Sequence, residues 1–159
     1  MPSAQYCTFS LGDHYFGLPI EQVQEVIRSQ RLTRVPRAPA AVAGLINLRG
    51  RIVTALDLRR LLEMAPAPEP ARGNVVLRGE DHGLSLLVDA IADVVEVDES
   101  AFEPPPDTLR GRKRALIRGA YKLERQLLLV LDLERLVAGE AALLKSPTPS
   151  TVISSRRDE

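Results

Sequence analysis

The stretch GLINLRGRIVTALDLRRLL, residues 44–62, holds the most ordered pattern in this chain. Two apolar runs flank a polar turn, Asn47-Leu48-Arg49-Gly50, and the second run, RIVTAL, is typical of a β-strand. Asp57 follows this strand and is a suitable helix N-cap, because its carboxylate can accept the N–H groups of a first helical turn. Three leucines then share one helical face: Leu58, Leu61 and Leu62. The stretch therefore predicts a strand that leads into a short, capped helix.

The same motif returns in the second half of the chain. Leu-Asp-Leu-x-Arg-Leu occurs at 56–61 and again at 131–136, where Asp132 would be the equivalent cap. A second motif, apolar–acid–x–apolar–x–acid–Val, occurs at 20–26 and at 88–94. Because both motifs keep their order, the chain divides into two similar halves. We expect them to span about 1–64 and 74–145, joined by a Pro/Ala-rich linker at 65–73.

Most signals within each half are those of β-structure. Two hairpins are predicted, one turning at Gly12-Asp13-His14 and one between Gly79 and Gly83. The run RQLLLVL, 125–131, lacks alternation and predicts a strand buried on both faces. The sum is about five short strands and one short helix per half. We therefore predict two small barrels, since closure removes exposed sheet edges.

Two segments are predicted to lie outside this regular structure. The stretch 103–114 is rich in proline and carries a basic run, so we expect an exposed loop there. Its basic residues are Arg110, Arg112, Lys113 and Arg114. The polar tail 146–159 is rich in Ser, Thr and Pro and is predicted to be disordered.

Composition excludes several classes of protein. The 159 residues carry 21 basic and 21 acidic side chains, and this balance argues against bulk binding to nucleic acid or acidic membranes. The sequence shows neither a signal-peptide pattern nor an apolar run of membrane-spanning length, so we expect a cytoplasmic location. The lone Cys7 cannot form an intramolecular disulfide and is predicted to be a buried structural residue.

No pattern of catalysis or metal binding stands out. His14 and His82 fall in separate predicted turns, and no glycine-rich phosphate loop, serine elbow or zinc-protease helix motif is present. We therefore predict no enzyme activity, no cofactor and no metal. A small-barrel module that binds nucleic acid remains the alternative, on the strength of the basic run, although a platform of stacking aromatics is missing. An interaction module is the favoured interpretation.

The residues resemble the family of CheW-like chemotaxis coupling proteins. The resemblance covers about 6–140, and Asn-Leu-Arg-Gly followed by Ile-Val and Asp-Leu-Arg is its most specific part. It implies one domain, 1–145, made of two SH3-like five-stranded β-barrels around a shared hydrophobic core, with short helices. It implies a non-catalytic adaptor between methyl-accepting chemoreceptors and the regulatory domain of a CheA-type histidine kinase. The pathway would be chemotaxis or a chemosensory system of the Frz or Wsp type.

The resemblance also implies a receptor-binding groove between the barrels. Carried onto this chain, the residues tied to that groove are Val23, Glu25, Gly44 and Arg49. We expect Arg49 to be held at the turn and directed at a partner helix, because a guanidinium suits carboxylates and the carbonyls at helix C-termini. The alternative is that Arg49 forms an intramolecular ion pair with Glu25.

Overall fold

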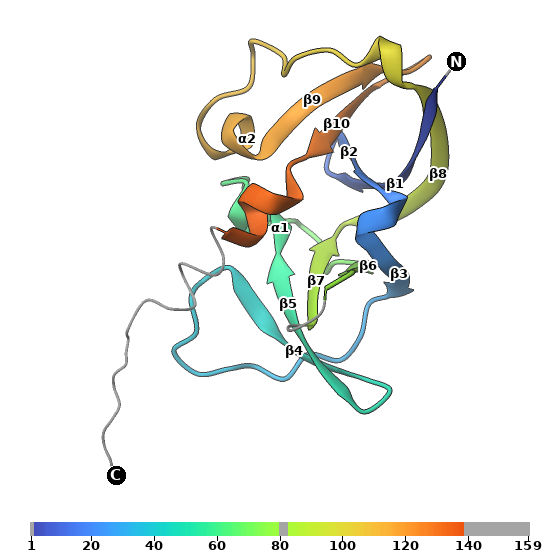
Figure 1. Ribbon diagram of the computed structural model, residues 1–159. Helices are drawn as coiled ribbons and strands as arrows, with labels where there is room; N and C mark the ends of the chain where they lie inside the picture. Colours follow the sequence, from blue (N-terminus) through green and yellow to red (C-terminus); the bar gives the residue numbers. More distant parts are fainter. Residues whose placement is uncertain (1, 80–82, 139–159) are drawn as a thin grey trace.

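The protein is mainly β in the computed structural model, which describes residues 2–79 and 83–138 (Figure 1). The first half of the chain forms β1 (Ser3–Leu11), β2 (His14–Pro19), β3 (Val23–Arg28), β4 (Val42–Leu48) and β5 (Arg51–Asp57). The second half forms β6 (Gly73–Leu77), β7 (Gly83–Val88), β8 (Ala90–Asp98), β9 (Ile117–Lys122) and β10 (Leu127–Leu131). The predicted five strands per half are confirmed.

Short helical segments connect or follow these strands. They are the 3-10 turns η1 (Ile20–Gln22) and η2 (Glu99–Ala101), the helices α1 (Leu58–Leu61) and α2 (Gly111–Leu116), and a helix at 133–138. Both predicted caps are confirmed. The backbone N–H of Arg60 donates to Asp57 Oδ1 at 3.3 Å, and that of Arg135 donates to Asp132 Oδ1 at 3.1 Å.

The strands assemble into two five-stranded sheets, with the orders β8-β1-β2-β10-β9 and β3-β6-β7-β5-β4. The division into one barrel at 1–64 and another at 74–145 is therefore wrong, because each sheet takes strands from both halves. Parallel pairing of β2 with β10 and of β5 with β7 joins the halves within each sheet. Apolar periodicity determines which face of a strand is buried, but it does not specify the neighbouring strand. The pairing of strands from different halves therefore could not be predicted from local sequence.

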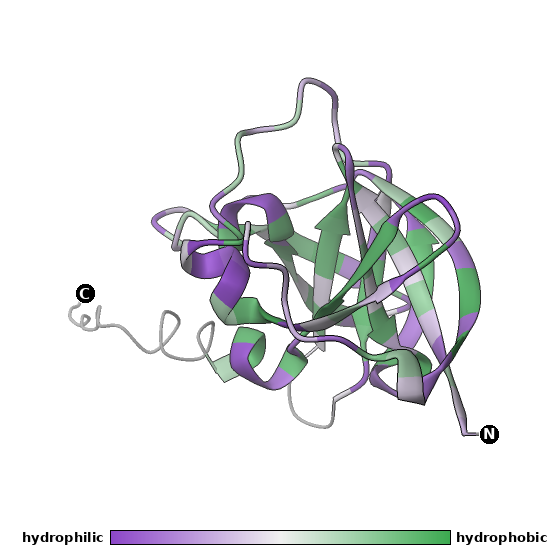
Figure 2. Cartoon of the chain, turned by 90° about the horizontal axis from the view of Figure 1, so that it is seen from above, coloured by the Kyte–Doolittle hydropathy of each residue, from purple (hydrophilic) through white to green (hydrophobic). Residues whose placement is uncertain are grey.

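One hydrophobic core is shared by the two sheets and the helices. Phe9, Phe16 and Leu18 enter it from the first sheet, and Leu56 and Leu86 enter it from the second. Leucines of α1 and of the 133–138 helix complete it: Leu58, Leu61 and Leu136. In Figure 2 hydrophobic residues concentrate on the strands, while many hydrophilic residues lie in the loops and helices around them. The shared core that the resemblance implied is thus present.

The proline-rich stretch 103–114 is not wholly the exposed loop that we predicted. Its end folds into the start of α2, whose last residue, Leu116, is buried at 4% exposure, and Leu109 just before the helix is buried at 8%. Arg112 Nε also donates to the carbonyl of Leu61 at 3.4 Å, which ties α2 to α1. Burial of these anchors against the core outweighs the poor helical signal of a short, Gly-initiated segment. The predicted disordered tail, 146–159, lies outside the described residues.

Candidate functional site

The turn Asn47–Gly50 is a tight hairpin that presents Arg49 at its tip. Leu48 pairs with Arg51 across the strands, so only Arg49 and Gly50 form the loop. Both have positive φ, 53° and 84°, as a primed two-residue turn requires. The Asn47 side chain accepts a hydrogen bond from the Gly50 N–H at 2.9 Å. This turn chemistry explains how an arginine is held beside glycine in a conformation that most side chains avoid.

Arg49 reaches across from this turn to strand β3. Its Nη2 forms an ion pair with Glu25 Oε2, which is the intramolecular pair expected as the alternative. The Arg49 side chain is nevertheless 66% exposed, against 27% for Glu25. An exposed pair of this kind contributes only ~0.2–1 kcal/mol to stability. The pair thus orients a guanidinium that still presents most of its surface to solvent.

Val23 and Gly44 are both buried. Val23 is 6% exposed and belongs to the main core, where it begins β3. A Cβ on Gly44 would lie 2.7 Å from the Thr33 carbonyl oxygen, closer than real Cβ atoms approach backbone. Thr33 pairs with Leu45 across this contact. Val23 and Gly44 therefore support β3 and the β4–β5 hairpin from the interior, whereas the side chains of Glu25 and Arg49 reach the protein surface.

An apolar hollow of about 370 Å³ lies between the ends of the two sheets. Strand β3 is the terminal strand of one sheet and β8 that of the other. Its lining is Val26, Ile27, Arg28, Arg72, Ala90 and Ile91. Edge strands have backbone groups that no neighbouring strand pairs with. Edge strands that also carry exposed apolar side chains are suited to binding another chain.

Two exposed valines were missed in the sequence: Val26, which lines this hollow, and Val94, further along β8. Val26 and Val94 are 42% and 57% exposed, which is high for large apolar side chains. They are the final residues of the two copies of the repeated acid–Val motif, at 20–26 and 88–94. The repeat was therefore a signal for them, because it placed equivalent valines on both terminal strands. Val26 and the other residues that line the hollow make an apolar surface, which we call the β3–β8 surface.

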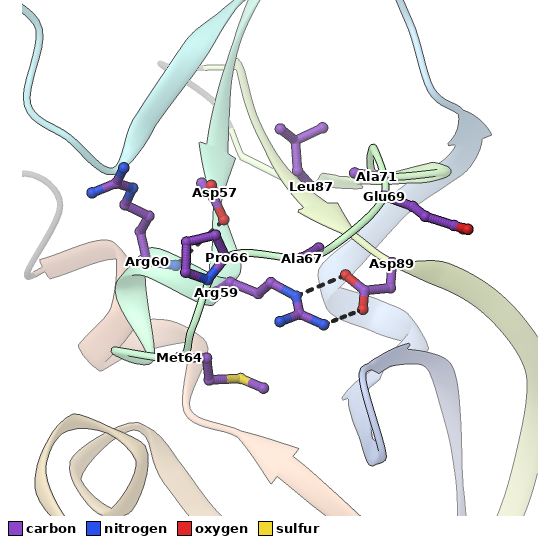
Figure 3. Close-up of a pocket in the computed structure, with 10 residues that line it drawn as sticks. All are labelled: Asp57, Arg59, Arg60, Met64, Pro66, Ala67, Glu69, Ala71, Leu87 and Asp89. Carbon is purple, nitrogen blue, oxygen red and sulfur yellow. Dashed lines mark hydrogen bonds and ion pairs between the residues drawn. The ribbon is translucent and has the colours of Figure 1, made fainter.

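A second hollow, of about 360 Å³, lies between α1 and the linker and is drawn in Figure 3. Its main feature is a bidentate pair in which Arg59 Nε and Nη2 donate to Asp89 Oδ1 and Oδ2 at 3.0 and 2.5 Å. The Gly12 N–H also donates to Asp89 Oδ2 at 2.7 Å, and Arg59 Nη1 donates to the Ala65 carbonyl. These contacts join α1, the linker, the β1–β2 turn and the β7–β8 junction.

The electrostatics of this site are dominated by the Arg59–Asp89 pair, which shifts the pKa of both partners. Hydrogen bonds from Arg59 lower the pKa of the Asp89 carboxyl, and those bonds raise the pKa of Arg59. The side chains are 13% and 25% exposed, so screening by solvent is only partial. Because these polar contacts run within the protein, the pair acts as a clamp between the two halves rather than as a ligand site.

The remaining candidates from the sequence have structural places. Cys7 is half-buried against the main core, and burial raises the pKa of its thiol, as befits a structural residue. His14 begins β2, whereas Asp81 and His82 lie outside the described residues. Within 2–79 and 83–138, no three His, Cys, Asp or Glu side chains gather as metal ligands would. No helix in those ranges is long and apolar enough to cross a membrane.

Comparison with known proteins gives a consistent result. The model of the CheW-like domain matches residues 5–141. The chemotaxis protein CheW of Treponema pallidum is 31% identical over 86% of this chain and 83% of its own length. Protein FrzA of Myxococcus xanthus is 38% identical over 66% of each chain. The crystal structure of the scaffolding protein TtCheW from Thermoanaerobacter tengcongensis aligns with a TM-score of 0.74, at 27% identity, over 86% of this chain and 88% of that one.

The two five-stranded sheets around one core, with an apolar surface where they meet, define an interaction scaffold. The chain belongs to the CheW-like domain family, as the resemblance indicated. The predicted role as a coupling adaptor in chemotaxis or related chemosensory signalling is confirmed at that level. These matches do not support the alternative of a nucleic-acid-binding barrel.

Proposed function

We propose that this protein is a non-catalytic adaptor that couples methyl-accepting chemoreceptors to a CheA-type histidine kinase in the cytoplasm. The observation that carries the receptor half of this proposal is the β3–β8 surface, where exposed Val26 lines an apolar hollow. The cytoplasmic tip of a receptor would dock there. The kinase regulatory domain would bind elsewhere on the barrels, so that both partners are held at once.

The chemistry of the β3–β8 surface suits an amphipathic helix. Such a helix lays apolar side chains at i, i+3, i+4 and i+7 into a groove of this kind. The Glu25–Arg49 pair supplies both signs of charge close by on β3 and the neighbouring turn. When a receptor helix binds, Arg49 can donate to an acceptor on that helix instead of to Glu25, because its planar guanidinium offers five donors. Val23 and Gly44 belong to the proposed site as the residues that hold β3 and the β4–β5 hairpin in position.

The test compares two exposed apolar side chains. Val26→Asn should weaken receptor-dependent activation of the kinase in a reconstituted system, because it places an amide at the apolar surface. Phe102→Asn is the control, since Phe102 is 39% exposed, close to the 42% of Val26, but lines neither this hollow nor the one beside the β3–β4 connection. It should leave activation unchanged. Both variants should still bind the kinase regulatory domain in a pull-down. Equal activation by wild type and Val26→Asn would remove the β3–β8 surface from the proposal.

A further inference from the structure

A row of arginines begins at the last residue of β3 and continues along the connection from β3 to β4. Arg28, Arg31, Arg34 and Arg37 recur at every third position, and no acidic residue occurs between Val26 and Leu56. We call the segment 28–37 the arginine strap. In Figure 1 it forms much of the long connection that runs from β3 to β4 around the end of the second sheet.

The strap is anchored to the sheet at Leu32 and Thr33 and is followed by a hydrogen-bonded turn of its own. The Thr33 N–H donates to the Leu45 carbonyl at 2.9 Å, and the Leu45 N–H returns the bond at 2.8 Å. Leu32 packs against a buried cluster that contains Ile46 and Val53. The Ala38 N–H donates to the Val35 carbonyl at 3.2 Å, and Pro36 restricts the backbone between them. A segment held in this way loses little conformational entropy when it binds a ligand.

The four arginines of the strap keep their charges available to solvent. All four residues are exposed. None of them takes part in the ion pairs found among the described residues. Neighbouring unpaired positive charges repel one another, so an anionic ligand would relieve this repulsion as well as gain its own contacts.

The strap also borders a third hollow, of about 680 Å³, which lies between the strap and α1. Arg34 and Arg37 lie on the strap side of this hollow and Arg60 lies on the α1 side. Its aliphatic lining comes from Leu32, Val35, Pro36 and Pro39. Among the described residues, Asp57 is the one carboxylate that lines the hollow, and it already accepts from the Arg60 backbone N–H.

We propose that this hollow binds an acidic, extended segment of a partner protein, in which carboxylates alternate with apolar side chains. Guanidinium groups bind carboxylates with paired hydrogen bonds, and the aliphatic lining accepts the side chains between them. A single-stranded nucleic acid fits less well, because no aromatic side chain in the described part of the chain lines the hollow for a base to stack on. This hollow shares no lining residue with the β3–β8 surface, although Arg28 at the start of the strap lines the latter, and neither proposal depends on the other.

The probe is a fluorescent peptide in which glutamate and leucine alternate, titrated with the full chain by anisotropy. Arg34→Glu should weaken binding at least about tenfold, because it replaces an attraction by a repulsion at the rim. Arg125→Glu makes the same change of charge at an exposed position on the β9–β10 turn and should change binding less than about twofold. A peptide with glutamine in place of glutamate should not bind. Unchanged circular dichroism spectra establish that the variants are folded.

Several outcomes would overturn the proposal. Equal weakening by Arg34→Glu and Arg125→Glu would mean that the peptide responds only to net charge. Tighter binding of an oligothymidylate than of the acidic peptide would point to nucleic acid instead. If the wild type self-associates and Arg34→Glu abolishes this, a second copy of the chain is the occupant. The stretch between Arg78 and Arg110 would supply the carboxylates, since its charged residues are acidic and it contains no lysine or arginine. Absence of peptide binding by the wild type would remove the site altogether.

Discussion

At the scale of single residues, Arg49 and Gly44 show two different ways in which this fold uses its positions. Arg49 sits in a left-handed turn and forms an exposed pair with Glu25. Gly44 is buried against the Thr33 carbonyl and leaves no space for a side chain. Because Arg49 is exposed, its substitution should weaken kinase activation. Because Gly44 is buried, its substitution should lower the stability of the fold.

Arg49→Ala is expected to leave the thermal midpoint nearly unchanged, because loss of an exposed pair costs less than ~1 kcal/mol. It should nevertheless weaken receptor-dependent kinase activation, since a docked arginine is often worth ~2 kcal/mol or more at an interface. Arg49→Lys should rescue only in part, because an ammonium lacks the planar fork. Glu25→Ala is the control. If both alanine variants lose the same small stability and keep full activation, the pair is structural only.

Gly44 also has a positive φ, 155°, so Gly44→Ala is expected to lower the free energy of unfolding by ~1–3 kcal/mol beyond the backbone strain, the cost of overpacking a well-filled site. Gly50→Ala is its matched control, since Gly50 has a positive φ but no atom within 4 Å of an added Cβ. That change should cost ~1–2 kcal/mol from backbone strain alone and leave the packing around Thr33 intact. Urea denaturation of both variants measures the difference. A Gly44→Ala protein as stable as the wild type would contradict the close approach.

At the scale of elements, two short helices depend on their caps more than on their length. Helix α1 has only four residues, Leu58–Leu61, too few to be stable in isolation. Its persistence comes from Asp57 at its start and from buried Leu58 and Leu61. The 133–138 helix repeats this arrangement with Asp132 and Leu136. Both helices could be predicted from the sequence, because a cap and its apolar stripe are local features.

Asp57→Ala and Asp132→Ala should each lower stability by about 1 kcal/mol, the usual worth of an N-cap. Asp57→Asn and Asp132→Asn should retain most of it, because an amide oxygen also accepts a hydrogen bond. Thermal unfolding followed by circular dichroism provides the measurement. An alanine variant with the wild-type midpoint would show that packing of the leucines alone sustains the helix.

At the scale of the whole molecule, the Arg59–Asp89 clamp joins the halves that the linker separates in sequence. The pKa of Asp89 is held below its ordinary value of 3.8, chiefly by hydrogen bonds from Arg59. Because the folded-state pKa lies below the unfolded value, the clamp stabilises the protein fully above that value. The stabilisation is lost as the pH falls through the folded-state pKa.

Wild type should therefore lose stability below pH 3.8 more steeply than Asp89→Asn, while the gap between them stays constant at higher pH. Thermal midpoints measured across this range test the expectation. Asp93→Asn is the control, since Asp93 is exposed on β8, four residues after Asp89, and its side chain forms none of the ion pairs found in the described residues. Parallel acid profiles for wild type and Asp89→Asn would rule out the clamp as an acid-sensitive contact.

The sequence by itself determined the strands, the capped helices, the Asn-Leu-Arg-Gly turn and the family. Each of these depends on residues within a few positions of one another, where periodicity, caps and turn chemistry act directly. The linker was visible for the same reason, and the duplication was visible because two such local motifs occur twice in the same order, at 20–26 and 88–94 and at 56–61 and 131–136. The site residues taken from the resemblance lie on β3, on β4 and in the turn, although Val23 and Gly44 prove to be buried.

Only the tertiary structure decided how the halves combine. Strands β1 and β2 join β8, β9 and β10, while β3, β4 and β5 join β6 and β7. This exchange brings β3 and β8 to the ends of different sheets and leaves Val26 and Val94 exposed there. It also sets Glu25 beside Arg49, 24 positions away in the chain. The physical reason is that strand pairing is decided by long-range burial, which the period-two pattern of a single strand does not encode.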